Sequence, residues 1–225
     1  MTRKIGFGLL WLGFIVYAFF LAPPDRPNTF ELIKNLSIGQ WQGINPLVIA
    51  LFYIMGIWPL IYSALALFDE RGQKIRAWPF ASASFAVGAF ALLPYLALRH
   101  PNPQFQGQKN AVLKLLDSRV TGIGLTIATT ILVAYGLQGN WSDFAQQWQT
   151  SRFIHVMSLD FALLCLLFPA LLTDDMARRG WKNPALFWLI TLIPLFGPLM
   201  YLCVRPSLPE RGLDTVSSSQ QTLTN

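Results

Sequence analysis

The stretch SRFIHVMSLDFALLCLLFPALLTDDMARRGW, residues 151–181, decides the fold because it holds an apolar run, residues 154–173, that ends in charged residues. A helix of about 20 apolar residues crosses the ~30 Å hydrocarbon core of a bilayer. Asp160 lies near the start of this run, where a carboxylate in lipid costs a few kcal/mol. The stretch predicts a transmembrane helix with one polar position that needs a structural or a functional reason.

The composition of the whole chain is too apolar for a soluble globule. Hydrophobic residues make up 53% of the 225 residues and charged residues 12%, and the mean hydropathy is +0.43. Soluble domains carry about one quarter charged residues. The net charge of +6 is spread in small groups between apolar runs and forms no basic stripe, so nucleic acid is excluded as a partner. The expected environment is the lipid bilayer.

Six apolar runs approach the length of a spanning helix, and each ends in charge, proline or glycine. They cover residues 5–22, 47–68, 79–98, 120–138, 154–173 and 185–204. We therefore expect an all-α polytopic bundle of six transmembrane helices in one domain, residues 1–207, followed by a disordered polar tail, residues 208–225. With six spans, eight Lys and Arg lie on the side of the N-terminus and nine on the other. The positive-inside rule then gives no orientation.

Three connections between these runs carry amphipathic patterns. They are residues 28–36, 108–117 and 141–148, and in the third the aromatic residues Trp141, Phe144 and Trp148 share one helical face. Short helices with one apolar face lie in the membrane interface. The sequence therefore predicts three short interfacial helices.

Two hairpins, DERGQKIRAWP and DDMARRGWKNP, each lead into an apolar run that ends in Tyr-Leu-x-x-Arg. The landmarks match at offsets of 106 and 105: Tyr95 with Tyr201, Arg99 with Arg205, and Asp69-Glu70 with Asp174-Asp175. Three spans in each half would invert the second copy. The hypothesis is a 3+3 inverted repeat with the two hairpins on opposite faces, and the alternative is that ordinary apolar runs align by chance.

His155 and Asp160 form a candidate polar site inside the membrane, with Thr126, Thr129 and Thr130 of the fourth run as candidate partners. Intramembrane ionisable residues serve as proton or ion relays, as ligands to a pigment metal, or as contacts to a partner protein. A carboxyl that is hydrogen-bonded to a hydroxyl on a neighbouring helix is the structural alternative. We expect the structural alternative for Asp160.

The residues Asp174, Asp175, Arg178 and Arg179 form a candidate interfacial charge cluster. The cluster is similar to the aspartate-rich motifs that bind prenyl diphosphates through magnesium, but a second acidic cluster is missing. Opposite charges four residues apart satisfy each other on a helix, so we expect a solvated turn. The sequence contains no HExxH, GxSxG, GxGxxG or P-loop motif. It assigns no catalytic residue and no metal ligand, and it leaves cofactors open.

Three stretches carry a family resemblance: NPLVIALFYIMGIWPL, RAWPFASASFAVGAFALLPYLALR, and the segments HVMSLDFALL, DDMARRGW and PLFGPLMYLCVRP. Over residues 40–207 the chain resembles a family of multi-pass integral membrane proteins of cyanobacteria and chloroplasts for which no activity or site is established. The resemblance implies a photosynthetic organism and a thylakoid or plasma membrane.

On this basis we expect a non-enzymatic protein that supports assembly or maintenance of photosynthetic membrane complexes and holds pigment or lipid. The alternatives are a small inverted-repeat transporter, paired with a second copy of itself, and a membrane enzyme that acts on an isoprenoid or a carotenoid.

Overall fold

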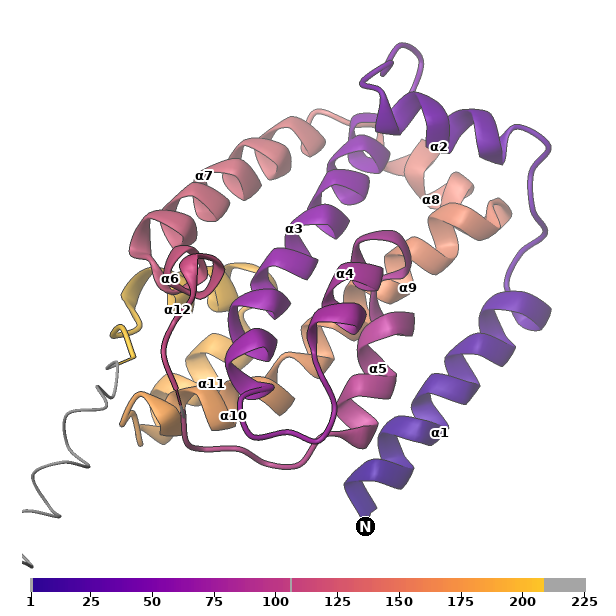
Figure 1. Cartoon of the computed structure of the whole chain (residues 1–225). Helices are drawn as coiled ribbons and strands as arrows, with labels where there is room; N and C mark the ends of the chain where they lie inside the picture. Colours follow the sequence, from indigo (N-terminus) through magenta and orange to yellow (C-terminus); the bar gives the residue numbers. More distant parts are fainter. Residues whose placement is uncertain (1, 106, 209–225) are drawn as a thin grey trace, which may run out of the picture.

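The computed structural model describes residues 2–105 and 107–208, and it arranges them as a bundle of helices without a strand in these residues (Figure 1). The elements are α1 (Thr2–Val16), the π-helical turn η1 (Tyr17–Leu21), α2 (Thr29–Ser37), α3 (Pro46–Asp69), α4 (Trp78–Val87), α5 (Ala89–Leu98), α6 (Ala111–Asp117), α7 (Arg119–Gly136), α8 (Trp141–Thr150), α9 (Arg152–Leu167), α10 (Pro169–Arg178), α11 (Pro184–Leu192) and α12 (Phe196–Val204). The predicted all-α class is confirmed, and the three predicted short helices are present as α2, α6 and α8. The predicted polar tail, apart from Leu208, lies outside the described residues.

Four helices in the described part of the chain are long and apolar enough to cross a membrane. They are Thr2–Leu21, Pro46–Asp69, Arg119–Gly136 and Arg152–Arg178. They correspond to the first, second, fourth and fifth predicted runs. The prediction of six spanning helices is wrong, because the third and sixth runs fold differently.

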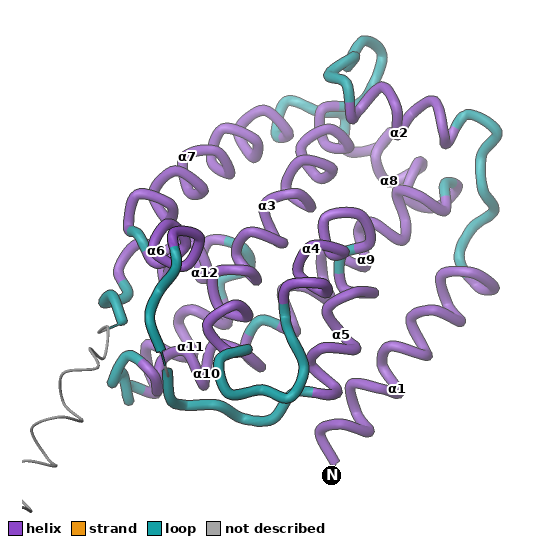
Figure 2. Tube along the Cα trace, in the orientation of Figure 1, coloured by secondary structure: helices purple, strands orange, loops and turns teal. Residues whose placement is uncertain are grey.

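The third run forms a helical hairpin of α4 and α5 (Figure 2). The chain reverses at Gly88, the residue between the two helices. Phe80, near the start of α4, packs on Tyr95, near the end of α5, with ring centroids 5.8 Å apart. In one straight helix these two residues would be about 22 Å apart. Gly88 has φ +51°, a conformation that residues with a side chain rarely adopt. Each arm of ten residues reaches ~15 Å, about half of a bilayer core.

The sixth run forms a second hairpin from α11 and α12. Trp181, just before α11, contacts Tyr201, near the end of α12, with ring centroids 6.0 Å apart. The reversal lies at Leu195, which has φ +62°. Both hairpins have the length and hydropathy of one spanning helix, so the run lengths alone could not reveal the reversals.

Both hairpins open at the same end of the molecule. We call this end the charged end; it comprises residues 2–4, 69–78, 99–119, 174–184 and 205–208. The opposite end, which comprises residues 22–45 and 137–152, is called the far end. Arg99, after the first hairpin, binds Asp174, before the second, and Arg178 donates to Asp69 over 3.2 Å. The hypothesis of an inverted repeat is therefore wrong, because it places these landmarks on opposite faces.

The two halves nevertheless share a pattern. The first residues of α3 and α9, the first residues of α4 and α11, and the last residues of α5 and α12 are each 106 positions apart. In addition, α1 packs on α5 as α7 packs on α12. Each half contributes two spanning helices and one hairpin, and an even number of spans keeps the second copy in the orientation of the first. We infer a parallel tandem repeat in which Asp69 corresponds to Asp175 without a gap.

The hairpins also change the balance of positive charge. Of the described Lys and Arg, 13 lie at the charged end, and Arg26, Lys34 and Arg152 lie at the far end. Arg211 lies outside the described residues. The six-span prediction placed nearly equal numbers of Lys and Arg on the two sides, because it treated each hairpin as a helix that crosses the membrane. In a membrane, the positive-inside rule places the charged end on the cytoplasmic side.

The helix α3 forms the centre of the bundle. In the most apolar stretch of α3, 61% of the residues are buried, whereas the share is 11% for α1 with η1 and 17% for α7. Trp58, Tyr62 and Leu65 of α3 have no exposed surface. The apolar outer surfaces of α1 and α7 suit contact with lipid.

Candidate functional site

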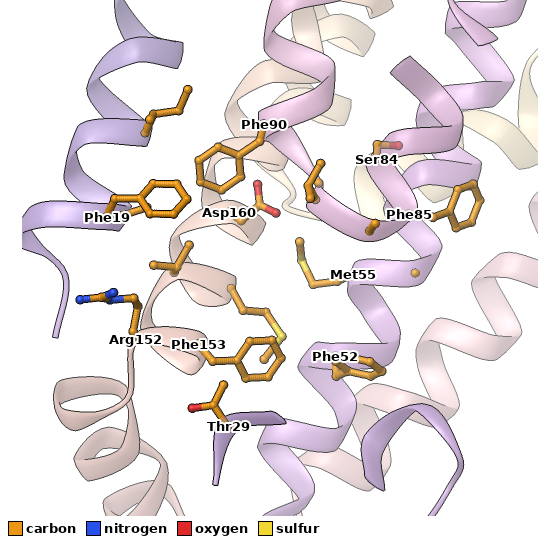
Figure 3. A pocket seen from close by; sticks show the side chains of 18 of the residues that line it. Phe19, Thr29, Phe52, Met55, Ser84, Phe85, Phe90, Arg152, Phe153 and Asp160 are labelled. Atoms are coloured by element: carbon orange, nitrogen blue, oxygen red, sulfur yellow. The ribbon is translucent and has the colours of Figure 1, made fainter. Parts of the chain in front are cut away.

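An apolar cavity of about 690 Å³ lies between α1, α3, the tip of the α4–α5 hairpin and α9 (Figure 3). Pockets of ~300–1,000 Å³ hold ligands of drug size. The walls are mainly aromatic and aliphatic and include Phe19, Phe52, Met55, Phe85, Phe90 and Phe153. At the rim, the side chains of Phe19 and Phe85 are 65% and 52% exposed. The cavity therefore opens among side chains that suit the hydrocarbon core.

The cavity exists because the α4–α5 hairpin turns back at mid-depth. A complete spanning helix would continue toward the far end and fill the space between α1, α3 and α9, whereas α4 ends at Val87. Gly56 of α3 adds to the space, since a Cβ atom at this position would meet no atom within 4 Å. The hollow thus follows from one backbone reversal and one missing side chain.

Asp160 of α9 lies at the deep end of the cavity, against the tip of the hairpin. Its Oδ1 accepts a hydrogen bond of 2.8 Å from the backbone N–H of Ala89, the first residue of α5. A helix N-terminus has unpaired N–H groups and favours negative charge. A Cβ atom on Gly88 would lie 1.8 Å from Oδ2. Asp160 therefore caps the half-helix α5 at the tip of the hairpin, which gives the carboxyl its structural reason.

The second carboxyl oxygen of Asp160 is not used in this cap. Oδ2 has no hydrogen-bond partner among the residues that the structure describes, although only 6% of the residue is exposed. Asp160 is also one of the residues that line the cavity. This oxygen is the one acidic group available to a ligand at the deep end.

His155, the first predicted companion of Asp160, lies in the first turn of α9 next to the far end and has other partners. Its Nε2 is 2.8 Å from the hydroxyl of Tyr17, and its Nδ1 is 2.9 Å from the carbonyl oxygen of Trp148. The imidazole also packs against the Trp148 ring, with centroids 4.3 Å apart and the ring planes tilted by 31°. His155 therefore joins α9 to η1 and α8, and its ring nitrogens are bonded to Tyr17 and Trp148 rather than to Asp160.

The threonines proposed as partners of Asp160 lie on α7, which packs on α3 and α12. Thr126 donates to the carbonyl oxygen of Gly122, and Thr130 donates to that of Thr126. Thr129 is fully buried and has no hydrogen-bond partner in the described part of the chain. The predicted grouping of Asp160 with these hydroxyls is wrong, because its partner is a backbone N–H of a different helix.

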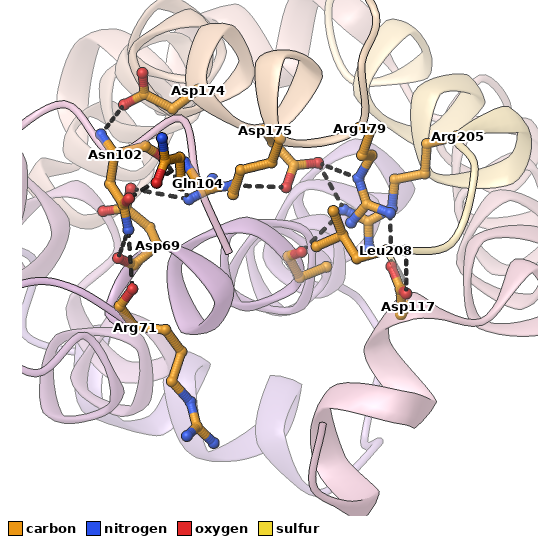
Figure 4. A network of polar contacts seen from close by, with 12 residues as sticks. Asp69, Arg71, Asn102, Gln104, Asp117, Asp174, Asp175, Arg179, Arg205 and Leu208 are labelled. Atoms are coloured by element: carbon orange, nitrogen blue, oxygen red, sulfur yellow. Dashed lines mark hydrogen bonds and ion pairs between the residues drawn. The ribbon is translucent and has the colours of Figure 1, made fainter. Parts of the chain in front are cut away.

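The charged end holds a buried ionic network (Figure 4). Asp69, at the end of α3, has no exposed surface and accepts 2.6 Å hydrogen bonds from Nε of Arg99 and from the hydroxyl of Tyr95. Asp174 also binds Arg99. Arg99 therefore ties the first hairpin to both α3 and α10.

A matching cluster surrounds Asp175, which is also fully buried. Its Oδ2 accepts hydrogen bonds from Nε of Arg179 over 2.8 Å, from the hydroxyl of Tyr201 over 2.7 Å, and from Arg205 over 3.1 Å. Arg179 also donates to Asp117 over 2.7 Å. An aspartate, a tyrosine and an arginine thus lock the base of each hairpin, at the same offset of 106 residues.

The expectation of a solvated turn is therefore wrong for the candidate charge cluster. Asp174, Asp175, Arg178 and Arg179 are at most 9% exposed. Of the two predicted pairs four residues apart, Asp175 with Arg179 is present, while Asp174 pairs with Arg99 instead. The cluster is a buried lock between helices.

The electrostatic environment stabilises the charged forms in this network. Burial by itself lowers the pKa of the Arg99 guanidinium, but Asp69 and Asp174 outweigh burial and raise this pKa above its usual value. Burial raises the pKa of Asp117, but Arg179 and Lys109 outweigh it and hold the pKa below its usual range. A carboxylate with a lowered pKa stabilises the fold at neutral pH, and this contribution is lost as the pH falls through the lowered pKa.

Comparisons with known proteins give no relative: the chain matches no family model, no curated protein and no solved structure. Among the described residues, no group of three or more His, Cys, Asp or Glu side chains gathers in a way that could hold a metal ion. The functional argument therefore rests on the cavity and its surroundings.

Substitution of Asp160 separates its cap role from a charge-dependent role. Asp160→Asn keeps an oxygen acceptor for the Ala89 N–H, so we expect near-normal abundance in the membrane. Asp160→Leu leaves that N–H unpaired and should lower the free energy of unfolding by ~1–3 kcal/mol. Thermal unfolding in detergent measures the difference. A leucine variant as stable as the wild type would contradict the cap.

Proposed function

We propose that this chain is a non-enzymatic integral membrane protein that binds a ligand with an apolar chain, a lipid or a pigment, in the cavity between α1, α3 and α9. We propose further that it supports assembly or maintenance of photosynthetic membrane complexes in a thylakoid or plasma membrane. The cavity of about 690 Å³ carries the binding proposal. The family resemblance is the support for the photosynthetic role.

The position of the cavity favours a ligand that arrives through the bilayer. Its rim side chains Phe19 and Phe85 are exposed and apolar, so a ligand can enter from the hydrocarbon core without crossing water. Water inside an apolar hollow finds too few polar partners. A lipid or pigment chain removes this cost and gains contact with the aromatic walls.

Filling the cavity tests the binding proposal. Gly56→Leu places a side chain in the cavity without a backbone clash. We expect the purified variant to retain about tenfold less bound ligand, the change that follows from a loss of ~1.4 kcal/mol in binding free energy. Organic extraction and mass spectrometry of the purified protein measure the retained ligand.

Gly124→Leu is the matched control for this experiment. Gly124 lies on the exposed surface of α7, and a Cβ atom there also meets nothing within 4 Å. This variant should retain ligand like the wild type. If Gly56→Leu and Gly124→Leu retain equal amounts, or if the wild type retains no apolar ligand, the binding proposal fails.

The photosynthetic role has a separate test. The tagged protein is purified in mild detergent from the membranes of a photosynthetic host, and its companions are identified by mass spectrometry. We expect subunits of a photosynthetic complex or its pigments to accompany the protein. Recovery of the protein alone, or only with a second copy of itself, would contradict this role.

A transporter is the second candidate, and the two hairpins favour it. Hairpins that end at mid-depth place helix termini inside the membrane, where transporters bind substrates and coupling ions. Asp160 of α9 binds the N–H of the first residue of α5, and it therefore lies at one of these helix termini. The transporter would be a parallel repeat rather than an inverted one. An Asp160→Asn variant that accumulates normally but has no function would favour transport over structural capping.

The third hypothesis, an enzyme that acts on an isoprenoid or a carotenoid, relied on Asp174 and Asp175 as magnesium ligands. Both carboxylates are held by arginines, Asp174 by Arg99 and Asp175 by Arg179 and Arg205. Their oxygens face these guanidinium groups. The hypothesis therefore gains no support from this cluster.

A further inference from the structure

A polar hollow of about 400 Å³ lies at the far end beside the apolar cavity, between the start of α2, the loop before α3, and α8. Thr29 lines both hollows. At the start of α9, Arg152 and Phe153 line the apolar cavity, while Ser151 and Ile154 line the polar hollow. The first turns of α2 and α9 therefore face both hollows, which are direct neighbours.

The polar hollow is rich in carboxamide side chains. They belong to Asn28, Asn35, Asn45, Gln146 and Gln147. A carboxamide both donates and accepts hydrogen bonds, as a hydroxyl group does. Asn45 is already hydrogen-bonded through both its carboxamide nitrogen and its oxygen, so Asn28, Asn35 and Gln146 are the carboxamides open to a ligand. Together they suit a group that carries several hydroxyls.

The charged side chains of the hollow disfavour an anionic ligand. Asp143 accepts hydrogen bonds of 2.7 Å from Asn45 and from Gln147, and Glu31 is a second carboxylate in the wall. The one basic residue, Arg26, already donates to the carbonyl oxygen of Thr150 over 3.2 Å. A phosphate would meet two acidic groups and one occupied arginine, so an uncharged group fits better.

We propose that the two hollows together bind one amphiphile, with its apolar chains in the cavity and an uncharged, hydroxyl-rich head group in the polar hollow. The chemical class is a glycolipid. This inference rests on the proposed function, because it assigns the head group of the ligand whose chain fills the cavity.

The depth of the polar hollow agrees with a lipid head group. Trp141, at the start of α8, is 60% exposed, and Trp41, in the loop before α3, is 39% exposed. Exposed tryptophans gather at the level of lipid head groups. The bound amphiphile then belongs to the leaflet at the far end, away from the basic residues of the charged end.

Lipid titration by native mass spectrometry tests this inference. The protein is delipidated in a polyoxyethylene detergent, which contains no sugar, and is titrated with monogalactosyl diacylglycerol, phosphatidylglycerol and diacylglycerol that carry the same chains. We expect the galactolipid to bind about tenfold more tightly than the other two. Equal binding of all three lipids, or tightest binding of phosphatidylglycerol, would overturn the inference.

Two matched variants on α8 locate the head group. Gln146 lines the polar hollow, whereas Gln149 is exposed on the same helix outside it. Gln146→Leu should reduce galactolipid binding to the level of diacylglycerol, and Gln149→Leu should leave it unchanged. If Gln146→Leu has no effect while Gly56→Leu weakens all three lipids, the head-group assignment fails and the proposed function stands. If no lipid binds to the wild type, both fail.

Discussion

Replacing Asp175 by leucine is expected to prevent the folded protein from accumulating in the membrane. Asp175 is fully buried and accepts hydrogen bonds from Arg179, Tyr201 and Arg205. Removing one partner of a buried ion pair costs ~3–5 kcal/mol, because the remaining charge stays buried without compensation. Total stabilities are only ~5–15 kcal/mol. Membrane abundance and the midpoint of thermal unfolding in detergent measure the loss.

The tandem repeat provides a second variant for this prediction. Asp69→Leu removes the corresponding carboxylate and should cause a loss of similar size, because Asp69 holds Arg99 and Arg178. Glu31→Leu is the control, since Glu31 is exposed in the first turn of α2. Wild-type abundance of both aspartate variants would show that the ionic network does not lock the hairpins.

A methyl group on Gly88 is the second change with a large expected effect. The Cβ atom of Gly88→Ala would lie 1.8 Å from Oδ2 of Asp160, and the φ of +51° is strained for alanine. Backbone strain of this kind costs ~1–3 kcal/mol. The clash also displaces Asp160 from the Ala89 N–H, which adds ~1–3 kcal/mol for the lost hydrogen bond. We expect the free energy of unfolding to fall by the sum of both effects.

A double variant, compared with its two single variants, separates strain from clash. Gly88→Ala combined with Asp160→Ala removes the clash but keeps the strained φ. The loss of unfolding free energy in this double variant should therefore not exceed the sum of the losses in the two single variants. Gly124→Ala is the control, because its added methyl meets nothing within 4 Å. Thermal unfolding of all four proteins in one detergent gives the comparison. A Gly88→Ala protein as stable as Gly124→Ala would contradict the hairpin geometry.

The spanning helices could be predicted from the sequence because length and hydropathy define them. The reversals could not, since residues 79–98 and 185–204 have the length and composition of a spanning helix. Gly88 within an apolar run was the local signal for a break in residues 79–98. In residues 185–204 the local signal was the run PLFGP around Leu195, where a Cβ atom on Gly197 would lie 2.0 Å from the carbonyl oxygen of Ile190. Proline inside an apolar run also fits a simple kink of a spanning helix, so this signal did not by itself predict a reversal.

The candidate site could be predicted in part. The sequence singled out Asp160 as a polar position in an apolar run, but its partner is the backbone N–H of Ala89, which no search for polar side chains can find. The sequence also selected the acidic pair Asp174 and Asp175, and the burial of this pair depends on Arg99 and Arg205, which directly follow the two hairpins. The cavity follows from where α4 stops, so it depends on the missed reversal.

The topology on which the cavity depends can be measured directly. In a chain with Cys165 and Cys203 replaced by alanine, single cysteines are introduced at Lys74, Lys182 and Lys34, and intact cells and inverted vesicles are treated with a membrane-impermeant thiol reagent. With four spans and two re-entrant hairpins, Lys74→Cys and Lys182→Cys should both react only from the cytoplasmic face, and Lys34→Cys only from the opposite one. Labelling of Lys74→Cys and Lys182→Cys from opposite faces would contradict the hairpins and the cavity that they create.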